Sequence, residues 1–191
     1  RSRPDAWAAL VTEQVAMANR QVDWHLKRAR VAAAQAIPGA RVELAPVVAA
    51  LVRVMDHVHA GRGVQVAVAP MQPDLAFAGE LEDLQEMLGN LMDNACKWAR
   101  QRVEMGAVAV HAAAGRLLVS VDDDGRGVDP ASSSDVFRRF SRLDEARNSD
   151  GGGSGLGLAI VASVAAAHRG DVAVARSPLG GARVSMWLPV S

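Results

Sequence analysis

The spacing of apolar positions changes several times along this chain, and each change predicts a boundary between elements. Residues 5–36 contain no glycine or proline, and apolar side chains recur there every three or four positions. This spacing predicts one helix of roughly 30 residues, about 45 Å long. A heptad-like stripe on so long a helix is typical of one arm of a helical hairpin or bundle. Pro38 and Gly39 end it.

The rest of the chain alternates between helical and extended patterns. Three stretches are predicted to be helices: 46–60, 80–100 and 156–168. Seven shorter stretches are predicted to be strands: 41–44, 64–69, 75–78, 103–112, 117–121, 172–176 and 182–188. This order predicts an α/β (α+β) two-layer sandwich, with one mostly antiparallel mixed sheet packed on about three helices. We therefore expect two domains, a helical segment at 1–38 and a sandwich at 39–191.

The predicted helix 80–100 has one polar face opposite its apolar stripe. At about 100° per residue, Glu86, Asn90, Asn94 and Lys97 fall within about 80° of one another. A carboxylate, two amides and an ammonium suit a magnesium–polyphosphate ligand. Mg²⁺ accepts carboxylate and amide oxygens, and a lysine offers a point charge to phosphate. The alternative is an amphipathic helix with a solvated polar face.

Two glycine motifs follow this helix. Asp123, Gly125 and Gly127 come directly after a predicted strand, where a carboxylate could lie deep in a pocket while the backbone passes close to a ligand. The alternative is a common acidic turn, and the alternating aspartates of a calcium loop are absent. Residues 151–157 run into a predicted helix, whose first N–H groups favour phosphate. A flexible linker is the alternative there, since neither the P-loop nor the dinucleotide spacing is matched.

Between the two glycine motifs, Phe137 and Phe140 stand in an otherwise polar stretch. Two aromatic residues there predict the anchor of a lid over residues 131–153, poorly ordered until a ligand binds. Arg142 could reach a terminal phosphate from this lid, and a solvated basic loop is the alternative.

In this order, the four motifs resemble the N, G1, F and G2 boxes of sensor histidine kinases. The boxes are Glu-x3-Asn-x3-Asn-x2-Lys, Asp-x-Gly-x-Gly, Phe-x-x-Phe and Gly-Ser-Gly-Leu-Gly-Leu. The resemblance covers residue 41 to the end, and the wording Asp-Asn-Ala-Cys-Lys resembles the PhoQ-like group. It implies the ATP-binding fold shared with gyrase, Hsp90 and MutL. The long first helix resembles the second helix of a dimerisation and histidine-phosphotransfer hairpin.

The resemblance implies a role for each matching residue of an ATP-dependent protein-histidine kinase. Asn90 would bind Mg²⁺, and Glu86 would lie near the reacting phosphate. Asp123 would accept a hydrogen bond from the adenine amino group. At the same position guanine has a carbonyl oxygen, which is an acceptor. Phosphates would contact Asn94, Lys97, Arg142 and the loop residues Gly153, Ser154, Gly155, Leu156 and Gly157. The chain would pass the base at Gly125 and Gly127, and Phe137 would be a further cofactor-binding residue.

The chain departs from the family's pattern in one large respect. The family's phosphoacceptor is a histidine followed by an acidic residue and, a few positions on, a proline. None of the five histidines has that context: His25, His57, His59, His111 and His168. We therefore expect all five to be structural or exposed, and the acceptor to lie on an upstream helix outside this chain. Two small departures are Asp124, where Asn is usual, and Arg126, where Pro is frequent.

Composition excludes several partners. Lysine and arginine total 21, as do aspartate and glutamate, so no net charge attracts nucleic acid. The longest apolar run, 156–167, is too short to span a bilayer. The one cysteine, Cys96, fits a reducing compartment and is expected to be a small buried hydrophobe. We expect the cytoplasmic portion of a bacterial protein that is anchored in the inner membrane only through upstream segments.

The resemblance also implies a homodimer through the first helix and a cognate response regulator as partner. Two other functions stay open from the residues alone. One is a gyrase- or Hsp90-like ATPase in which Glu86 activates water, and the other is a nucleotide-binding scaffold without catalysis. The long upstream helix and the short lid favour the kinase, because the ATPases use longer lids and downstream transducer domains.

Overall fold

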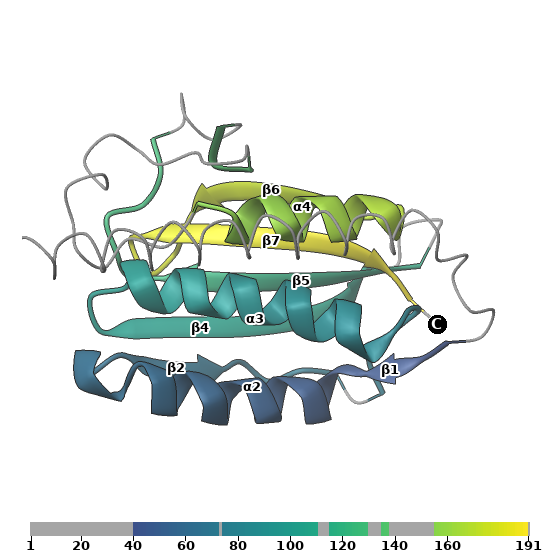
Figure 1. Cartoon of the computed structure of the whole chain (residues 1–191), viewed down its shortest axis with the longest axis horizontal. Coiled ribbons are helices and arrows are strands. Elements are labelled where there is room, and N and C mark those ends of the chain that lie inside the picture. Colours follow the sequence, from purple (N-terminus) through teal and green to yellow (C-terminus); the bar gives the residue numbers. More distant parts are fainter. Residues whose placement is uncertain (1–39, 73, 111–114, 130–134, 138–154, 191) are drawn as a thin grey trace, which may run out of the picture. The chain divides into compact units, whose positions relative to one another are not determined.

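Five strands form one sheet in the order β2-β4-β5-β7-β6 (Figure 1). The structure is a computed structural model and describes residues 40–72, 74–110, 115–129, 135–137 and 155–190. All of them belong to the second of two units into which the chain divides, Ala36–Ser191. The predicted helix at 5–36 lies outside the described residues. The strands of the sheet are β2 (Gln65–Val68), β4 (Arg102–Val110), β5 (Arg116–Asp123), β6 (Asp171–Arg176) and β7 (Ala182–Pro189).

Only one pairing in this sheet is parallel. β2 runs parallel to β4, and the other three pairs are antiparallel, which confirms the predicted mixed, mostly antiparallel sheet. The β4–β5 register sets Val103 opposite Asp123, and the β5–β7 register sets Asp122 opposite Arg183. A separate two-stranded sheet joins β1 (Val42–Glu43) to β3 (Ala76–Phe77).

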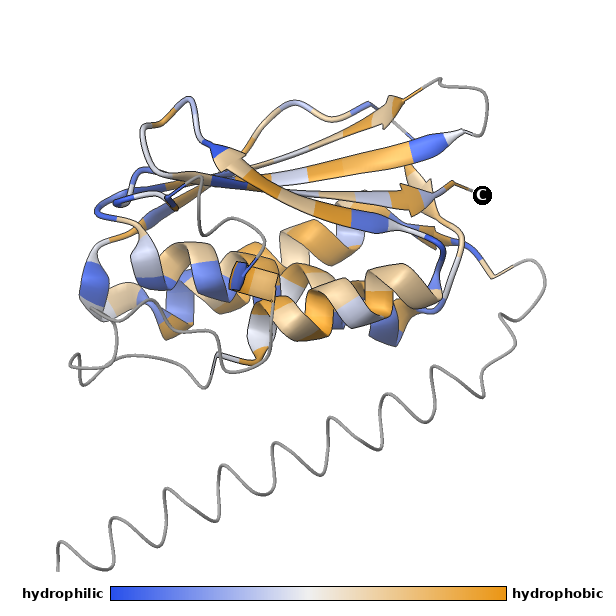
Figure 2. Cartoon of the chain, turned by 90° about the horizontal axis from the view of Figure 1, so that it is seen from above, coloured by the Kyte–Doolittle hydropathy of each residue, from blue (hydrophilic) through white to orange (hydrophobic). Residues whose placement is uncertain are grey.

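Three helices cover one face of the five-stranded sheet (Figure 2): α2 (Leu44–Val58), α3 (Leu81–Trp98) and α4 (Gly157–Ala167). Alternate residues of the central strands are buried, and together they form the sheet's side of the core: Val103, Met105, Ala107, Leu117, Val119, Val121, Val184, Met186 and Leu188. The predicted two-layer sandwich is therefore confirmed. Among the described residues, no helix is both long and apolar enough to cross a membrane.

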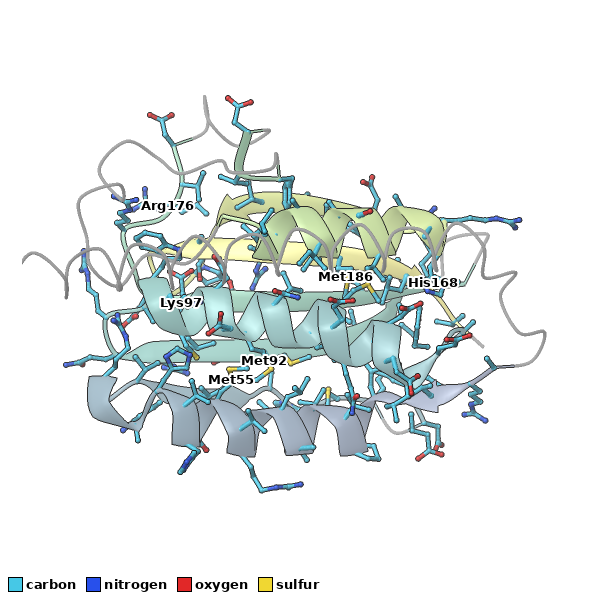
Figure 3. The ribbon with its side chains drawn as sticks, viewed as in Figure 1. Met55, Met92, Lys97, His168, Arg176 and Met186 are labelled. Carbon is cyan, nitrogen blue, oxygen red and sulfur yellow. The ribbon has the colours of Figure 1, made fainter. Side chains whose placement is uncertain are left out.

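Helix α3 is the central helix of the core. The apolar stripe predicted for it is buried at Leu84, Met87, Leu88, Leu91, Met92 and Ala95. Figure 3 shows Met55 of α2 and Met92 of α3 where the two helices face each other, and both are buried. Cys96 is also fully buried, as expected. Burial, followed by the charges of Asp93 and Asp56, raises the pKa of its thiol to about 11.

Two boundaries differ from those that the sequence predicts. Helix α2 begins at Leu44, whereas we predicted a strand through that residue and a helix only from Pro46. Proline is tolerated in the first helical turn, because the N–H that it lacks would have no partner inside the helix. Strand β5 continues through Asp122 and Asp123, two residues past the predicted end. Aspartate is disfavoured in strands, and here hydrogen bonds to both carboxylates offset that preference.

Replacing Leu88 by alanine should strongly destabilise the domain. Leu88 is fully buried on α3, whereas Leu81 in the first turn of the same helix is 41% exposed. Leu88→Ala is expected to cost about 2–5 kcal/mol in the free energy of unfolding, through lost burial and the cavity left behind. Leu81→Ala is the matched control and should cost less than about 1 kcal/mol. Urea unfolding of the two variants measures both, and equal costs would contradict the central role given to α3.

Candidate functional site

Four segments that are far apart in the sequence meet at one end of the sheet. They are the C-terminal half of α3, the end of β5, the turn between β6 and β7, and the start of α4 (Figure 1). Figure 3 shows Lys97 at this end of α3 and His168, just after α4, at the opposite end. Three close approaches tie the segments together: Gly125 to the Trp98 carbonyl, Gly181 to Asp123, and Gly157 to Asn90.

Asp123 is the most deeply placed of the candidate residues. It is the last residue of β5 and is buried, with 4% exposure. Its Oδ1 accepts hydrogen bonds from the N–H of Gly125, at 2.8 Å, and of Ala182, at 3.2 Å. Burial raises the pKa of this carboxyl, the two N–H groups oppose the rise, and the charges of Asp124 and Asp122 add to it. The site therefore holds a carboxylate acceptor in a poorly hydrated place, where a matching donor binds strongly.

Backbone forms the wall around this carboxylate. A Cβ at Gly125 would collide with the Trp98 carbonyl oxygen, and one at Gly181 would collide with Asp123 Oδ1. Gly127 has a φ of +77°, a conformation that glycine adopts without strain. Gly125 and Gly127 therefore lie in close contact with neighbouring backbone, and their predicted passage beside a base stays a prediction. Gly181 was not among the predicted residues. Glycine is common in β-turns, and the pair Gly180-Gly181 lies in the turn between β6 and β7. The sequence therefore held no signal for the contact of Gly181 with the site.

The polar face of α3 is half-buried, as the predicted site requires, and Asn90 has a defined orientation on it. Its Nδ2 donates to the carbonyl oxygen of Glu86 at 2.8 Å. Its Oδ1 lies toward α4, since a Cβ placed on Gly157 would be 3.1 Å from that atom. An amide oxygen that faces a helix start, one turn from the Glu86 carboxylate, suits a hard cation such as Mg²⁺ that is also bound by phosphate.

Helix α4 begins at this same place. Its N-cap, Leu156, makes no side-chain cap bond, and the first backbone bond is donated by the Ile160 N–H to the Leu156 carbonyl oxygen at 2.9 Å. The N–H groups of the first turn have no acceptor within the helix, which favours an anion. Leu156 is buried, with 4% exposure. Gly155 has a φ of +68°, which again suits glycine.

The remaining predicted site residues divide into two groups. Phe137 ends the short 3₁₀ helix η3 (Asp135–Phe137), and its half-buried ring packs against the core. Arg142, Gly153 and Ser154, together with most of the predicted lid, lie outside the described residues, so their roles stay predictions.

Lys97 has a partner that the site prediction left out. Its Nζ donates to Asp93 Oδ2, and the buried His59 Nε2 lies 3.1 Å from Asp93 Oδ1. Arg62 Nη2 donates to the Lys97 carbonyl oxygen at 2.9 Å. These contacts hold the lysine end of α3 against the end of α2. The Asp93–Lys97 spacing of four residues is a signal that sequence reasoning could have used. His168 Nε2 lies 2.6 Å from Asp83 Oδ2. His168 and His59 therefore have structural roles, as we expected.

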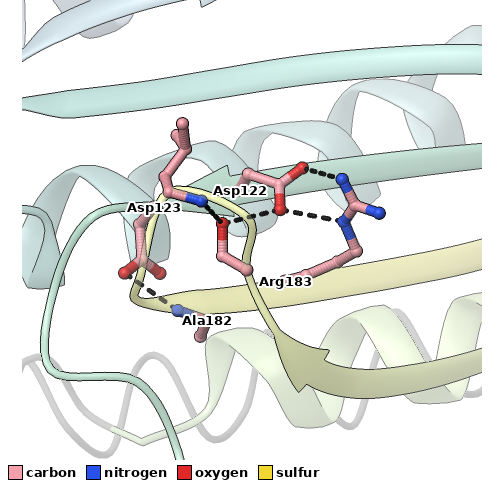
Figure 4. Close-up of polar contacts among 6 residues, drawn as sticks. Asp122, Asp123, Ala182 and Arg183 are labelled. Carbon is pink, nitrogen blue, oxygen red and sulfur yellow. Dashed lines mark hydrogen bonds and ion pairs between the residues drawn. The ribbon is translucent and has the colours of Figure 1, made fainter.

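The three consecutive aspartates at the end of β5 have three different partners. Asp122 accepts hydrogen bonds from Arg183 (Figure 4) and from Ser177. Asp123 binds the N–H groups described above. Asp124 accepts from the N–H groups of Arg100 and Gln101 just after α3. Burial opposes the ionised form of Asp124, but the backbone N–H groups around it prevail and lower its pKa. The sequence predicted a role for Asp123 alone.

Comparisons with known proteins agree with this geometry. Residues 79–191 match the family described as histidine kinase-, DNA gyrase B- and HSP90-like ATPase. The chain is 38% identical over 182 residues to the sensor protein kinase CarS of Pseudomonas aeruginosa, an alignment that covers 95% of this chain and 38% of CarS. It is 29% identical over 177 residues to the sensor protein PhoQ of Escherichia coli K12, which covers 93% of this chain and 35% of PhoQ.

A solved structure shows the same likeness. The crystal structure of full-length ShkA in complex with AMPPNP superimposes with a TM-score of 0.72 at 25% identity, covering 100% of this chain and 40% of ShkA. The chain thus spans well under half the length of these relatives.

Asp123→Asn should gain stability relative to the wild-type chain as the pH rises. Because the folded-state pKa of Asp123 is raised above 3.8, the folded chain keeps a proton there that the unfolded chain has released. Wild-type stability therefore falls as the pH rises through that interval. Asparagine has nearly the same shape and stays neutral. Urea midpoints of both proteins at about pH 3.5 and about pH 7 measure the effect. A difference between the midpoints that is independent of pH would contradict it.

Proposed function

This chain belongs to the family of histidine kinase-, DNA gyrase B- and HSP90-like ATPases, and we propose that it performs the following reaction as the ATP-binding catalytic module of a sensor histidine kinase. It binds ATP together with Mg²⁺ and transfers the γ-phosphate to a histidine on an upstream helix, for relay to a response regulator. One observation carries the proposal: the buried carboxylate of Asp123 shares one end of the sheet with the amide of Asn90 and with the start of helix α4 at Gly157.

Asp123 recognises the base. Its carboxylate complements the amino group of adenine and repels the carbonyl oxygen that guanine has at the same position. Because Asp123 lies in a buried site, an unpaired partner there costs more free energy than it would in water. The site should therefore prefer ATP and ADP to GTP.

Phosphates bind at the other side of the site. The first-turn N–H groups of α4 face the anion, Asn90 Oδ1 is the group that would hold Mg²⁺, and Glu86 would lie near the reacting phosphate. A bound Mg²⁺ supplies charge neutralisation on the phosphoryl group that is transferred. Asn94 and Lys97 add an amide and an ammonium on the same helix face, and Lys97 reaches a phosphate by exchanging its contact with Asp93.

The protein contributes positioning and electrostatics to this reaction. Phosphoryl transfer requires the attacking nitrogen in line with the leaving oxygen, and little covalent work remains for side chains. We further propose that the acceptor histidine is presented by a helical hairpin, that two copies of the protein pair through that hairpin, and that the module faces the cytoplasm. The relatives named above are sensor proteins, which favours this kinase function over a hydrolytic machine.

Asp123→Ala should weaken ATP binding by about tenfold or more, since losing a charge-assisted hydrogen bond costs about 1.5–3 kcal/mol. Titration calorimetry with MgATP measures the loss. Asp56→Ala, an exposed aspartate on α2, is the control and should bind as the wild-type chain does. An unchanged affinity in Asp123→Ala would remove the assignment of the adenine contact.

The chain should bind ATP but fail to phosphorylate itself, and should phosphorylate a separate helical hairpin that carries an acceptor histidine. Asn90→Ala should abolish that transfer by removing the Mg²⁺ ligand, whereas Asn90→Asp keeps an oxygen there and should retain part of it. The measurement is acid-labile phosphate on the hairpin after incubation with labelled ATP. Label on this chain alone that persists in Asn90→Ala would overturn the proposal.

A further inference from the structure

Two neighbouring carboxylates of β5 hold the same turn from opposite faces of the sheet. Successive side chains of a strand point to opposite faces. Asp123 faces the helices, and Asp122 lies on the other face, opposite Arg183 in the register of β5 and β7. Both contact the segment 177–182, which joins β6 to β7 (Figure 4).

On the outer face, Arg183 forms an ion pair with the buried Asp122, and Ser177 donates a hydrogen bond to it. Arg183 donates to it through Nε at 2.8 Å and Nη2 at 2.9 Å, and Ser177 Oγ donates to Asp122 Oδ1 at 2.8 Å. The same Oγ accepts from the N–H of Leu179 at 3.0 Å. The Ser177 hydroxyl therefore links Asp122 directly to the backbone of the turn.

On the inner face, the same turn is bound to Asp123. The N–H of Gly181 donates to the Asp123 carbonyl oxygen at 3.1 Å, and that of Ala182 donates to Asp123 Oδ1 at 3.2 Å. Within the turn, the Ser177 N–H donates to the Gly181 carbonyl oxygen at 2.9 Å. Among the described residues, all hydrogen bonds of the Asp123 carboxylate fall on Oδ1, so Oδ2 is the atom left to face a base.

We propose that Ser177, Asp122 and Arg183 are positioning residues that set the selectivity of the site for a 6-aminopurine, by fixing the turn whose Ala182 N–H holds Asp123 Oδ1. This inference rests on the proposed function, in which Asp123 accepts from the adenine amino group. None of the three side chains contacts the nucleotide, because they lie on the sheet face away from the helices. Their effect passes through the backbone of residues 177–182.

The charges support this division of labour. Asp122 is nearly fully buried, and Arg183, about 39% exposed, compensates its charge through two hydrogen bonds. Asp122 and Asp123 are adjacent and both buried, and the charge of Asp122 contributes to the raised pKa of Asp123. Arg183 offsets that charge at the point where the base-binding carboxylate has to stay ionised.

The test compares two ligands, ATP and purine riboside 5′-triphosphate, which lacks the 6-amino group and is otherwise the same. The ratio of their dissociation constants isolates the contact between that amino group and Asp123. Ser177→Ala should lower the preference for ATP about three- to tenfold, the equivalent of one hydrogen bond, and leave the affinity for the analogue unchanged. Arg183→Ala is a second variant with the same expected result.

Matched variants make each outcome decisive. Ser185→Ala, two residues along β7 from Arg183 and half-buried, should keep the wild-type ratio. Ser177→Thr keeps the hydroxyl and should show the wild-type ratio of the two dissociation constants. If Ser177→Ala and Arg183→Ala keep the wild-type ratio, or weaken both ligands equally, the positioning role is overturned. If Asp123→Ala itself leaves the ratio unchanged, the adenine contact in the proposed function is what fails.

Discussion

The hydrogen bonds that converge on Asp123 Oδ1 are the interaction on which the site depends. They join the loop after β5, through Gly125, to the start of β7, through Ala182, across a carboxylate that water barely reaches. A carboxylate buried in this way without partners would be protonated or would disrupt the fold. Two backbone donors make it tolerable, and both of them bind the same oxygen, Oδ1.

Helix α3 carries a second constraint, because it serves the core and the site at once. Its buried stripe fixes the helix against the sheet, and this in turn fixes the rotation of its polar face. Asn90 then needs only one bond to the Glu86 carbonyl to direct its oxygen toward α4. Rigid placement of this kind is what phosphoryl transfer demands of a protein, since a small displacement of the reacting groups costs much of the rate.

The sequence predicted the layers, the mixed sheet and the polar face of α3, because these depend on periodicity and on the order of motifs. It missed the Asp93 partner of Lys97, although their spacing of four residues on one helix is a local signal, and it did not predict the partners of Asp122 or of Asp124. Such contacts join residues up to 61 positions apart, as in Asp122 and Arg183, and a single sequence carries no register between β5 and β7. The end of β5 was placed two residues early for the same reason, since only tertiary bonds offset the poor strand propensity of aspartate.

The backbone wall around Asp123 has a consequence for chemical biology. Selective inhibition of an engineered enzyme commonly relies on trimming a bulky pocket residue so that an enlarged ligand fits. Gly125 and Gly181 have no side chain that could be shortened, and any added side chain collides with the Trp98 carbonyl or with Asp123 itself. If Asp123 accepts from the adenine amino group as proposed, orthogonal ligands would have to change the donor pattern at the purine's position 6, with a matching exchange at Asp123, instead of adding bulk on that side of the base.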